Sequence, residues 1–514
     1  MNPMFPIRKL SCAITLAAST LICNTAFAAA TLYTNVNGYT FENGQLNKFN
    51  AIQINDDKVV QVFSTKNKVQ AADDINVIDG KGKTMLPGLI DAHGHVLSYG
   101  LSLLRADLMG TSSEQDAIDR LQKYSKQNAQ LAWLRGRGWN QTQWPSNAFP
   151  TAKSLDKHFT DKPVVLGRVD GHAIWVNSKA MALAGINKNT KEVEGGQIIR
   201  DEDGEPTGVF IDNAMNLVYS KIPAPSPSET EYALKIAMKS LASVGLTSVH
   251  DAGITSENID AFKSLSSANS MDIRVNAMID VTDPNWQEQM AKGHFKDSQE
   301  FLTINSVKIS ADGALGSRGA ALIEDYSDLP HHKGLLLHSD EQLTQIIETS
   351  MQAGFQVNTH AIGDNANKKV IDNYEALIKK TDTKHLRHRV EHAQVLQISD
   401  IPRFAQLGII ASMQATHATS DKNMAEERLG SDRIKGAYAW RSLIDNKAII
   451  AAGSDFPVEY PNPFFGLHAS VTRQDQQNQP LQGWYINEGM TLTEAFRSFT
   501  LDAAYAGHQE TLIG

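Results

Sequence analysis

One stretch of the sequence, Met85-Leu86-Pro87-Gly88-Leu89-Ile90-Asp91-Ala92-His93-Gly94-His95, indicates both the fold and the chemistry of the chain. Residues two apart on an extended strand point the same way, so His93 and His95 can offer two imidazoles to one point in space. Imidazole is the commonest protein ligand for zinc and related metals, and a strand end holds it stiffly. The alternative is a pair of ordinary polar residues where a strand ends, and the rest of the chain decides between the two.

Amphipathic helices alternate with short apolar strands over much of the remaining sequence. We expect a capping box at Ser228-x-x-Glu231 to open a helix that stops at Gly245, directly before an apolar strand. A second box, Ser339-x-x-Gln342, opens a similar helix that stops at Gly354. A helix that enters a buried strand through a glycine is the unit of a parallel α/β fold.

Eight strands of this kind, each ending in polar residues, favour an α/β fold of the (β/α)₈ TIM-like barrel type. They are expected at Leu89–His93, Leu246–His250, Ile273–Ile279, Ser306–Ser310, Phe355–His360, His388–His392, Ile409–Met413 and Ile449–Asp455. In such a barrel the chemistry lies at the carboxyl ends of the strands. Pro163 to Arg168 is open to interpretation as a ninth barrel strand.

The chain is expected to divide into five parts. Residues 1–28 are a signal peptide, 29–85 a small β subdomain, 86–130 the start of the barrel, 131–220 an insertion over the barrel mouth, and 221–514 the remainder of the barrel. In the β subdomain, Ala51–Ile54 and Val59–Phe63 flank a turn and predict a hairpin.

The first residues have the pattern of a secretory signal. Arg8 and Lys9 precede an apolar run from Leu10 to Ile22, and Ala26-Phe27-Ala28 fits a cleavage site after Ala28. The alternative, a membrane anchor, is disfavoured because the run is short against the roughly 20 residues needed to span a bilayer. We therefore expect a periplasmic or secreted protein that has no membrane anchor after cleavage.

Composition and charge exclude several classes of protein. With 41% hydrophobic and 20% charged residues, the 514-residue chain has the composition of a soluble globular protein. Its only two cysteines, Cys12 and Cys23, lie in the expected signal, which excludes a disulfide scaffold or cysteine nucleophile in the mature chain. The net charge of −9 argues against a nucleic-acid partner, and a small-molecule substrate is expected.

The residues with metal chemistry fall at the expected strand ends and would form one ring. They are His93, His95, Lys308, His360, His392 and Asp455. Any single histidine after a strand is more often structural, but several at successive strand ends are not expected by chance. A site of imidazoles and carboxylate suits zinc, with iron, manganese or nickel also possible.

The motif from Leu86 to His95 resembles the opening motif of the amidohydrolase superfamily. Six further motifs resemble the branch that contains N-substituted formamide deformylase. They are Gly136-Arg137-Gly138-Trp139, Asp170-Gly171-His172, Val307-Lys308-Ile309 with Asp312-Gly313, His360-Ala361-Ile362-Gly363-Asp364, Val390-Glu391-His392-Ala393 and Gly453-Ser454-Asp455-Phe456-Pro457. The resemblance runs from about Gly82 to Ala504 and implies a hydrolase of non-peptide C–N bonds, in amides, formamides or carbamates.

Carried over residue by residue, the resemblance implies two divalent metal ions, with zinc expected. His93 and His95 would bind the more buried metal, and His360 and His392 the second. Lys308 would bridge both as a carbamate; the alternative is a lysine neutralised by an acid such as Asp312. A hydroxide that bridges the metals would attack the substrate carbonyl. Asp455 would coordinate the first metal, accept the proton of the water and return it to the departing amine.

Several other polar residues are candidates for contact with the substrate. They are His172, His250, Asp312, Arg318 and His417. The three histidines could stabilise an oxyanion or be structural, and Arg318 could hold a substrate anion or pair with Glu324 or Asp325. A tryptophan set in the insertion could line a pocket or form a core: Trp139, Trp144 and Trp175.

Two other functions remain open. One is a one-metal, deacetylase-like hydrolase with an unmodified Lys308, and the other is a periplasmic small-molecule binding protein on a degenerate barrel. Members of the family normally continue past the helix that opens with Thr491-x-x-Glu494 into strands that complete the N-terminal β sandwich. Since this chain stops at Gly514, we expect the sandwich to be incomplete. The substrate and the oligomeric state do not follow from the sequence.

Overall fold

The computed structural model describes residues 30–64, 75–141, 144–168, 173–193, 196–316 and 318–513. The expected signal peptide, both cysteines and His172 lie outside these residues. The chain divides into two compact units, Met1–Pro87 and Gly88–Gly514. Within the described part of the chain, no helix combines the length and apolar character needed to cross a membrane.

The first unit consists of two small sheets. Its strands are β1 (Thr31–Thr34), β2 (Asn37–Glu42), β3 (Gln45–Phe49), β4 (Ala51–Asn55), β5 (Lys58–Phe63), β6 (Asn76–Asp79) and β7 (Thr84–Met85). They form a four-stranded sheet in the order β5-β4-β1-β6 and a three-stranded sheet in the order β3-β2-β7. The predicted hairpin is confirmed, because β4 and β5 pair antiparallel with Ile52 opposite Val62. A small core of Val36, Phe49 and Ile52 holds the unit together.

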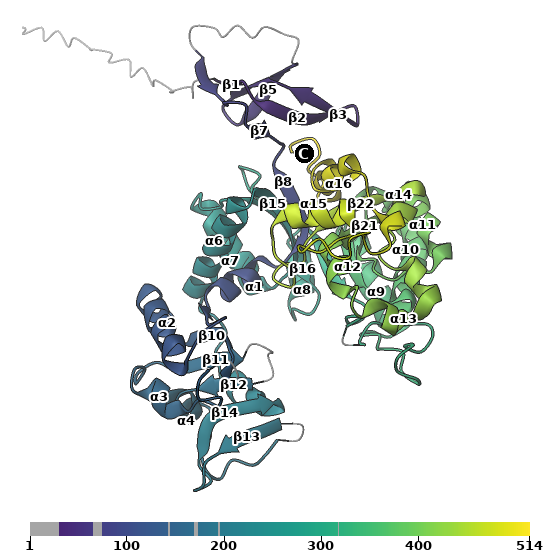
Figure 1. The fold of residues 1–514 in the computed structure, drawn as a ribbon. Coiled ribbons are helices and arrows are strands. Elements are labelled where there is room, and N and C mark those ends of the chain that lie inside the picture. The colour runs from purple at the N-terminus through teal and green to yellow at the C-terminus, as the bar shows by residue number, and fades with distance from the viewer. Residues whose placement is uncertain are drawn as a thin grey trace, which may run out of the picture. The chain divides into compact units, whose positions relative to one another are not determined.

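The second unit contains eight parallel strands that form a nearly closed barrel (Figure 1). The strands are β8 (Leu89–Gly94), β15 (Leu246–Ile254), β16 (Arg274–Asp280), β18 (Leu302–Ser310), β19 (Gln356–Ala361), β20 (Arg389–His392), β21 (Ile410–Gln414) and β22 (Ile449–Gly453). All eight were predicted, and they follow one another around the sheet in chain order. The short β17 (Phe295–Lys296) pairs antiparallel with β18 outside this ring.

The first and last strands of the barrel meet at their carboxyl ends. The Asp455 amide donates to the His93 carbonyl at 2.7 Å, and the His95 amide donates to the Phe456 carbonyl at 2.8 Å. A Cβ at Gly453 would lie 2.5 Å from the His93 nitrogen, so only glycine allows this approach. The closure therefore brings together residues that are 362 and 361 positions apart in sequence, from the motifs that follow the first and the last barrel strand.

Helices connect the strands and lie outside the sheet (Figure 1). They are α1 (Val96–Leu103), α6 (Pro227–Ser243), α7 (Ser256–Ser267), α8 (Trp286–Ala291), α9 (Asp340–Gln352), α10 (Asp364–Thr381), α11 (Ile401–Leu407), α12 (Ala415–Asp421), α13 (Ala425–Arg433), α14 (Trp440–Asp445), α15 (Pro463–Thr472), α16 (Leu492–Ser498) and α17 (Leu501–Ala506). The capping boxes at Ser339 and Thr491 are confirmed. The prediction at Ser228 was wrong by two residues, since Ser226 caps α6 together with Glu229 and Pro227 takes the first helical position.

A separate six-stranded sheet interrupts the barrel repeat between α1 and α6. Its strands are β9 (Ala106–Asp107), β10 (Leu134–Trp139), β11 (Val164–Arg168), β12 (Ala173–Val176), β13 (Gly196–Arg200) and β14 (Pro206–Asp212), in the order β13-β14-β12-β11-β10-β9. Its helices are α2 (Glu114–Gln127), α3 (Ala152–Asp156), α4 (Ser178–Leu183) and α5 (Asn216–Tyr219). Pro163 to Arg168, which the sequence left open as a ninth barrel strand, thus lies at β11 of the insertion sheet. The sheet begins with β9 at Ala106, ahead of the predicted start of the insertion at residue 131.

The three tryptophans of the insertion form a core. Trp139, Trp144 and Trp175 have exposed fractions of 0%, 3% and 0%, and each ring centroid lies 6.0–6.3 Å from the other two. Their indole nitrogens are satisfied by backbone carbonyls, as expected for buried tryptophans. The sequence left open whether these tryptophans line a pocket or form a core, and in the structure they form a core.

Candidate metal centre

Five of the six predicted ring residues lie at or just beyond the carboxyl ends of barrel strands. His93 lies near the end of β8, and His95 follows that strand. His360 and His392 lie at the ends of β19 and β20, and Asp455 follows β22. Lys308 lies within β18, two residues before its end.

Asp455 lies at the centre of the imidazole groups. Its Oδ1 is 3.1 Å from His95 Nε2 and 3.6 Å from His93 Nε2, and its Oδ2 is 3.7 Å from His417 Nε2. Two compact groups of potential ligands share this carboxylate, one with His93 and His95 and the other with His392 and His417. The His392 ring centroid is 4.7 Å from that of His93 and 4.6 Å from that of His360. The four predicted histidines and Asp455 thus lie together in the structure, and His417 of α12 joins them.

The inner nitrogens of the ring carry the features of metal ligands. The buried Nε2 atoms of His93, His360 and His417 have no hydrogen-bond partner among the described residues. Each lies 3.4–3.7 Å from a carboxylate oxygen, which belongs to Asp312 for His360 and to Asp455 for the other two. Burial lowers the pKa of His93 to about 4, although Glu391 and Asp455 raise it. Burial, followed by the neighbouring His360, also lowers the pKa of His392 well below its ordinary value. The lowered pKa values keep the His93 and His392 imidazoles neutral beside the buried Asp455 carboxylate, and this set of nitrogen and oxygen donors fits a divalent metal.

The outer nitrogens of two histidines are fixed by hydrogen bonds. His93 Nδ1 donates to Glu391 Oε2 at 2.5 Å, and His392 Nδ1 donates to Gln414 Oε1 at 2.7 Å. The Gln414 amide nitrogen donates to the Ser412 carbonyl at 3.3 Å, which orients the amide oxygen toward His392. A donor at Nδ1 leaves the lone pair on Nε2, so these contacts select the tautomer that binds metal.

Glu391 belongs to a buried polar network beneath the ring. Both of its oxygens meet the Arg389 guanidinium, at 2.7 Å from Nε and 3.0 Å from Nη2. Arg389 also donates to the Ala92 carbonyl at 2.7 Å and to the Ser412 hydroxyl at 2.8 Å. Burial raises the pKa of Glu391, but Arg389 and His93 outweigh it and hold the pKa below its ordinary value. The carboxylate thus stays charged and orients His93.

Asp91 supports the same end of the barrel from β8. Its Oδ1 accepts from the amides of His93 and Ser454, both at 3.1 Å, and its Oδ2 accepts from the Ser454 hydroxyl at 2.6 Å. Burial raises the pKa of Asp91 to about 7 against these bonds. Asp91 therefore links β8 to the segment that carries Asp455.

Lys308 is buried, with 6% of its surface exposed. Burial lowers the pKa of its ammonium group, although Glu391, Asp455 and Asp280 raise it. The sequence-based alternative was neutralisation by Asp312, but Asp312 is occupied elsewhere. Its Oδ1 accepts from the Ile362 amide at 3.0 Å, and its Oδ2 accepts from the amides of Ala321 and Gly363 at 2.9 and 2.8 Å.

The remaining predicted substrate contacts differ in their surroundings. His250 is fully buried in β15, where its Nδ1 accepts from Arg389 Nη1 at 2.9 Å. Arg318 pairs with Asp328 through Nε at 3.2 Å and Nη2 at 2.8 Å, so the proposed pairing with Glu324 or Asp325 was wrong. The chain between Arg318 and Asp328 forms a compact loop, which brings the more distant acid within reach.

Sequence reasoning did not assign roles to Arg389, Glu391, Gln414 and Asp91. Glu391 and Asp91 stand beside the ligand histidines in the quoted motifs, and Arg389 is two residues before Glu391 on the same strand. Alternation along β20 is therefore the signal that could have paired these two residues. No comparable signal identifies Gln414, which reaches His392 from the neighbouring strand.

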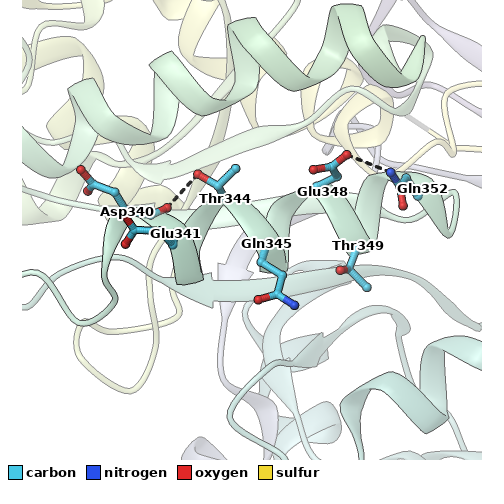
Figure 2. Close-up of a pocket in the computed structure, with 7 residues that line it drawn as sticks. All are labelled: Asp340, Glu341, Thr344, Gln345, Glu348, Thr349 and Gln352. Atoms are coloured by element: carbon cyan, nitrogen blue, oxygen red, sulfur yellow. Dashed lines mark hydrogen bonds between the residues drawn. The ribbon is translucent and has the colours of Figure 1, made fainter.

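A surface depression of 620 Å³ lies along α9 (Figure 2), away from this chemistry. Seven side chains of that helix line it, from Asp340 to Gln352, and none belongs to the ring. The side chains are polar; Gln352 donates to the Glu348 carboxylate, and the Thr344 hydroxyl donates to the Asp340 carbonyl. We assign no chemistry to this depression.

The fold and site together define a class: α/β-barrel proteins with histidine and aspartate side chains at the carboxyl ends of the strands that could hold a metal ion. The chain belongs to the Amidohydrolase family, whose model matches residues 76–514. It is 34% identical over 439 residues to the Bacillus subtilis (strain 168) protein named "Putative amidohydrolase YtcJ", covering 84% of this chain and 82% of that protein.

Two further proteins are similar. N-substituted formamide deformylase of Arthrobacter pascens is 25% identical over 480 residues, with 87% of this chain and 84% of that protein covered. The crystal structure of an uncharacterized metal-dependent hydrolase from Pyrococcus horikoshii OT3 superposes with a TM-score of 0.75 at 26% identity, covering 95% of this chain and 94% of the other. The family and this neighbour support a hydrolase that uses metal.

Proposed function

We propose that the protein hydrolyses a non-peptide C–N bond of a small amide, formamide or carbamate in a metal-dependent reaction. The observation that carries the proposal is the Asp455 carboxylate held 3.1–3.7 Å from three imidazole nitrogens. The similarity to N-substituted formamide deformylase supports the bond type.

The ring offers ligands for two divalent ions, and we propose zinc. His93, His95 and Asp455 would hold the first, and His360 and His392 the second, with Lys308 between them. His417 is a further candidate because it shares a compact group with His392 and Asp455. Bound divalent ions would lower the pKa of a water molecule and polarise the substrate carbonyl.

Asp455 is placed to move the proton of the reaction. Although burial raises its pKa, the contacts with His95 and then His93 hold that pKa well below the ordinary value. The side chain is thus a carboxylate near neutral pH and can accept a proton from the attacking water. The same group, once protonated, can deliver that proton to the departing amine nitrogen.

The surroundings of Lys308 support its modification to a carbamate. Burial favours the neutral amine, whose lone pair can attack carbon dioxide with loss of one proton. The product is an anionic oxygen ligand, which removes the cost of an ammonium group beside two cations. Mass spectrometry of the intact, undenatured protein tests this directly, since an unmodified Lys308 would contradict it.

A one-metal hydrolase is the second candidate, because His93, His95 and Asp455 form a compact ligand group by themselves. The two candidates differ in stoichiometry, near one or near two metal ions per chain.

We also propose that residues 1–28 direct the chain to the periplasm or outside the cell. An N-terminus at Met1 in a processed periplasmic or secreted fraction would contradict this localisation.

The experiment for the proposed function is turnover of an amide, formamide and carbamate panel by the wild-type chain and by Asp455→Asn. We expect chelator-sensitive hydrolysis of at least one class and a loss of about 10²-fold or more in Asp455→Asn. The control is Asp432→Asn, a change at a side chain that is 91% exposed. Equal turnover by Asp455→Asn and Asp432→Asn, or a metal-loaded protein inactive on the whole panel, would refute the proposal.

A further inference from the structure

Gly136-Arg137-Gly138-Trp139 is a motif that the hydrolase chemistry does not use. It lies on β10 of the insertion, beside β11 (Figure 1), and β10 also pairs with β9. Leu134 belongs to the tryptophan core, and a Cβ at Gly136 would point at Leu166 and Ala106 of the same core, so the alternate residues Arg135 and Arg137 face the other side of the sheet. A cavity of 210 Å³ opens on that side and is lined by Arg105, Arg135, Gly136, Arg137, Val165, Gly167, Arg168 and Tyr219.

A glycine of the neighbouring strand, Gly167, is one of the residues that line the cavity. Gly167 lies opposite Arg137 in the register of β10 and β11. The atoms nearest to a Cβ at Gly167 would be those of the Arg137 side chain and the Gly136 carbonyl, at 3.7 Å or more. The Arg137 side chain and Gly167 therefore line the same part of the cavity.

Three of the lining arginines are not neutralised by the described part of the chain. Arg105, Arg135 and Arg137 form no ion pair with a described carboxylate, and the buried Nε of Arg105 has no hydrogen-bond partner there. The acid opposite Arg137 in the register, Asp107, turns its Oδ1 to the Met109 amide at 3.0 Å. Arg168 differs, since it donates to Gln141 and Asn140.

The cost of this arrangement is electrostatic. Burial and then the charge of Arg135 lower the pKa of Arg105, with Arg137 adding to the effect. Three guanidinium groups around one cavity repel each other, and their planar N–H forks match the oxygens of phosphate and carboxylate. A dianion offsets three positive charges better than a single carboxylate does. We propose that this arginine pocket, formed by Arg105, Arg135 and Arg137, binds a phosphate group.

The test is isothermal titration calorimetry of the full chain with inorganic phosphate at low salt. We expect one phosphate bound in the pocket, with an affinity that falls as sodium chloride is added. Arg135→Gln should weaken this binding by about tenfold or more, since it removes charge-assisted hydrogen bonds. Any phosphate that binds at the metal centre should bind equally well to the wild type and to Arg135→Gln, because the substitution alters none of the ring residues.

The matched control is Lys179→Gln, which removes one positive charge from an exposed position on α4 of the same insertion. It should bind phosphate like the wild type. Circular dichroism measures whether each variant folds. If Arg135→Gln does not fold, Arg137→Gln, at a more exposed position, replaces it in the phosphate titration. Equal phosphate affinity in the arginine variant and Lys179→Gln would overturn the proposal, as would tighter binding of acetate than of phosphate.

A second arm distinguishes the source of the phosphate. Glycerol 3-phosphate carries the same group on an organic substituent. Tighter binding than inorganic phosphate would assign the pocket to phosphate esters, and equal or weaker binding would assign it to the free ion. Hydrolysis of the amide panel does not depend on this outcome, so the pocket and the proposed function fail independently.

Discussion

Replacement of Glu391 by glutamine tests how the buried network supports the metal centre. The change keeps the volume of the side chain but removes its charge and one of its two acceptor oxygens. Arg389 and Glu391 have exposed side-chain fractions of 1% and 0%, so the guanidinium would lose its buried counter-charge. Loss of one partner of a buried pair costs about 3–5 kcal/mol in the free energy of unfolding.

The same substitution should weaken metal binding. The His93 Nδ1 proton loses its carboxylate acceptor at 2.5 Å, so the imidazole can change tautomer and withdraw the Nε2 lone pair from the ring. Loss of an outer partner of this kind typically lowers metal affinity by about 10- to 100-fold.

Two assays measure the two effects in Glu391→Gln. Urea denaturation followed by circular dichroism gives the free energy of unfolding, and competition with a chromogenic chelator gives the zinc affinity. The control is Glu257→Gln, at an exposed position in the first turn of α7. If Glu391→Gln matches this control within about 0.5 kcal/mol in stability and twofold in zinc affinity, the account of the network is wrong.

Three further outcomes are expected from substitutions outside the ring. Asp312→Ala should lower the free energy of unfolding by more than about 3 kcal/mol, because three buried amides lose their acceptor; a loss under about 1 kcal/mol in urea denaturation would contradict this. Tyr374→Phe removes a hydroxyl that bonds the Thr359 side chain at 2.8 Å and two carbonyls at 3.0 Å, so it should cost about 1–3 kcal/mol. Its zinc affinity should not change, and a parallel fall in zinc affinity would argue against a purely structural role for the tyrosine. Hydrogen bonding to Arg441 lowers the pKa of Glu494 from 4.5 to about 2 in the folded state. Because the folded protein holds the Glu494 proton less tightly than the unfolded chain does, the Glu494 carboxylate stabilises the protein at pH values above 4.5. Glu494→Gln should therefore cost about 1 kcal/mol near pH 7 after solvent screening, a difference that shrinks as pH falls from 4.5 toward about 2. A difference that stays constant or grows in acid denaturation curves would exclude this linkage.

The barrel could be predicted because its strands are marked locally. An apolar strand such as Ile449–Ala452 indicates burial in a parallel sheet, and a polar residue at the end of such a strand, such as Asp455, identifies the carboxyl edge. Once eight such ends are assigned to one barrel, the ring of His93, His392 and Asp455 follows from topology alone. The structure places these three side chains together as that reasoning requires.

The contacts that were missed depend on spatial neighbours that have no fixed spacing in the sequence. Arg318 pairs with Asp328 because of the path of a loop, and Gln414 reaches His392 from an adjacent strand. The cap of α6 was misplaced because Ser226 and Ser228 each precede a glutamate by three residues, and only the proline at position 227 distinguishes them. The pocket of three arginines was not predicted because β9 and β10 are joined through a long helical connection.

Metal analysis of the purified full chain tests the central claim most directly. After dialysis against zinc and removal of free metal, we predict about two zinc ions per wild-type chain and a clear loss in His95→Ala. The control His158→Ala, at an exposed histidine of the insertion, should retain the wild-type content. A wild-type chain that retains only trace metal, or a His95→Ala variant with undiminished zinc, would contradict the account.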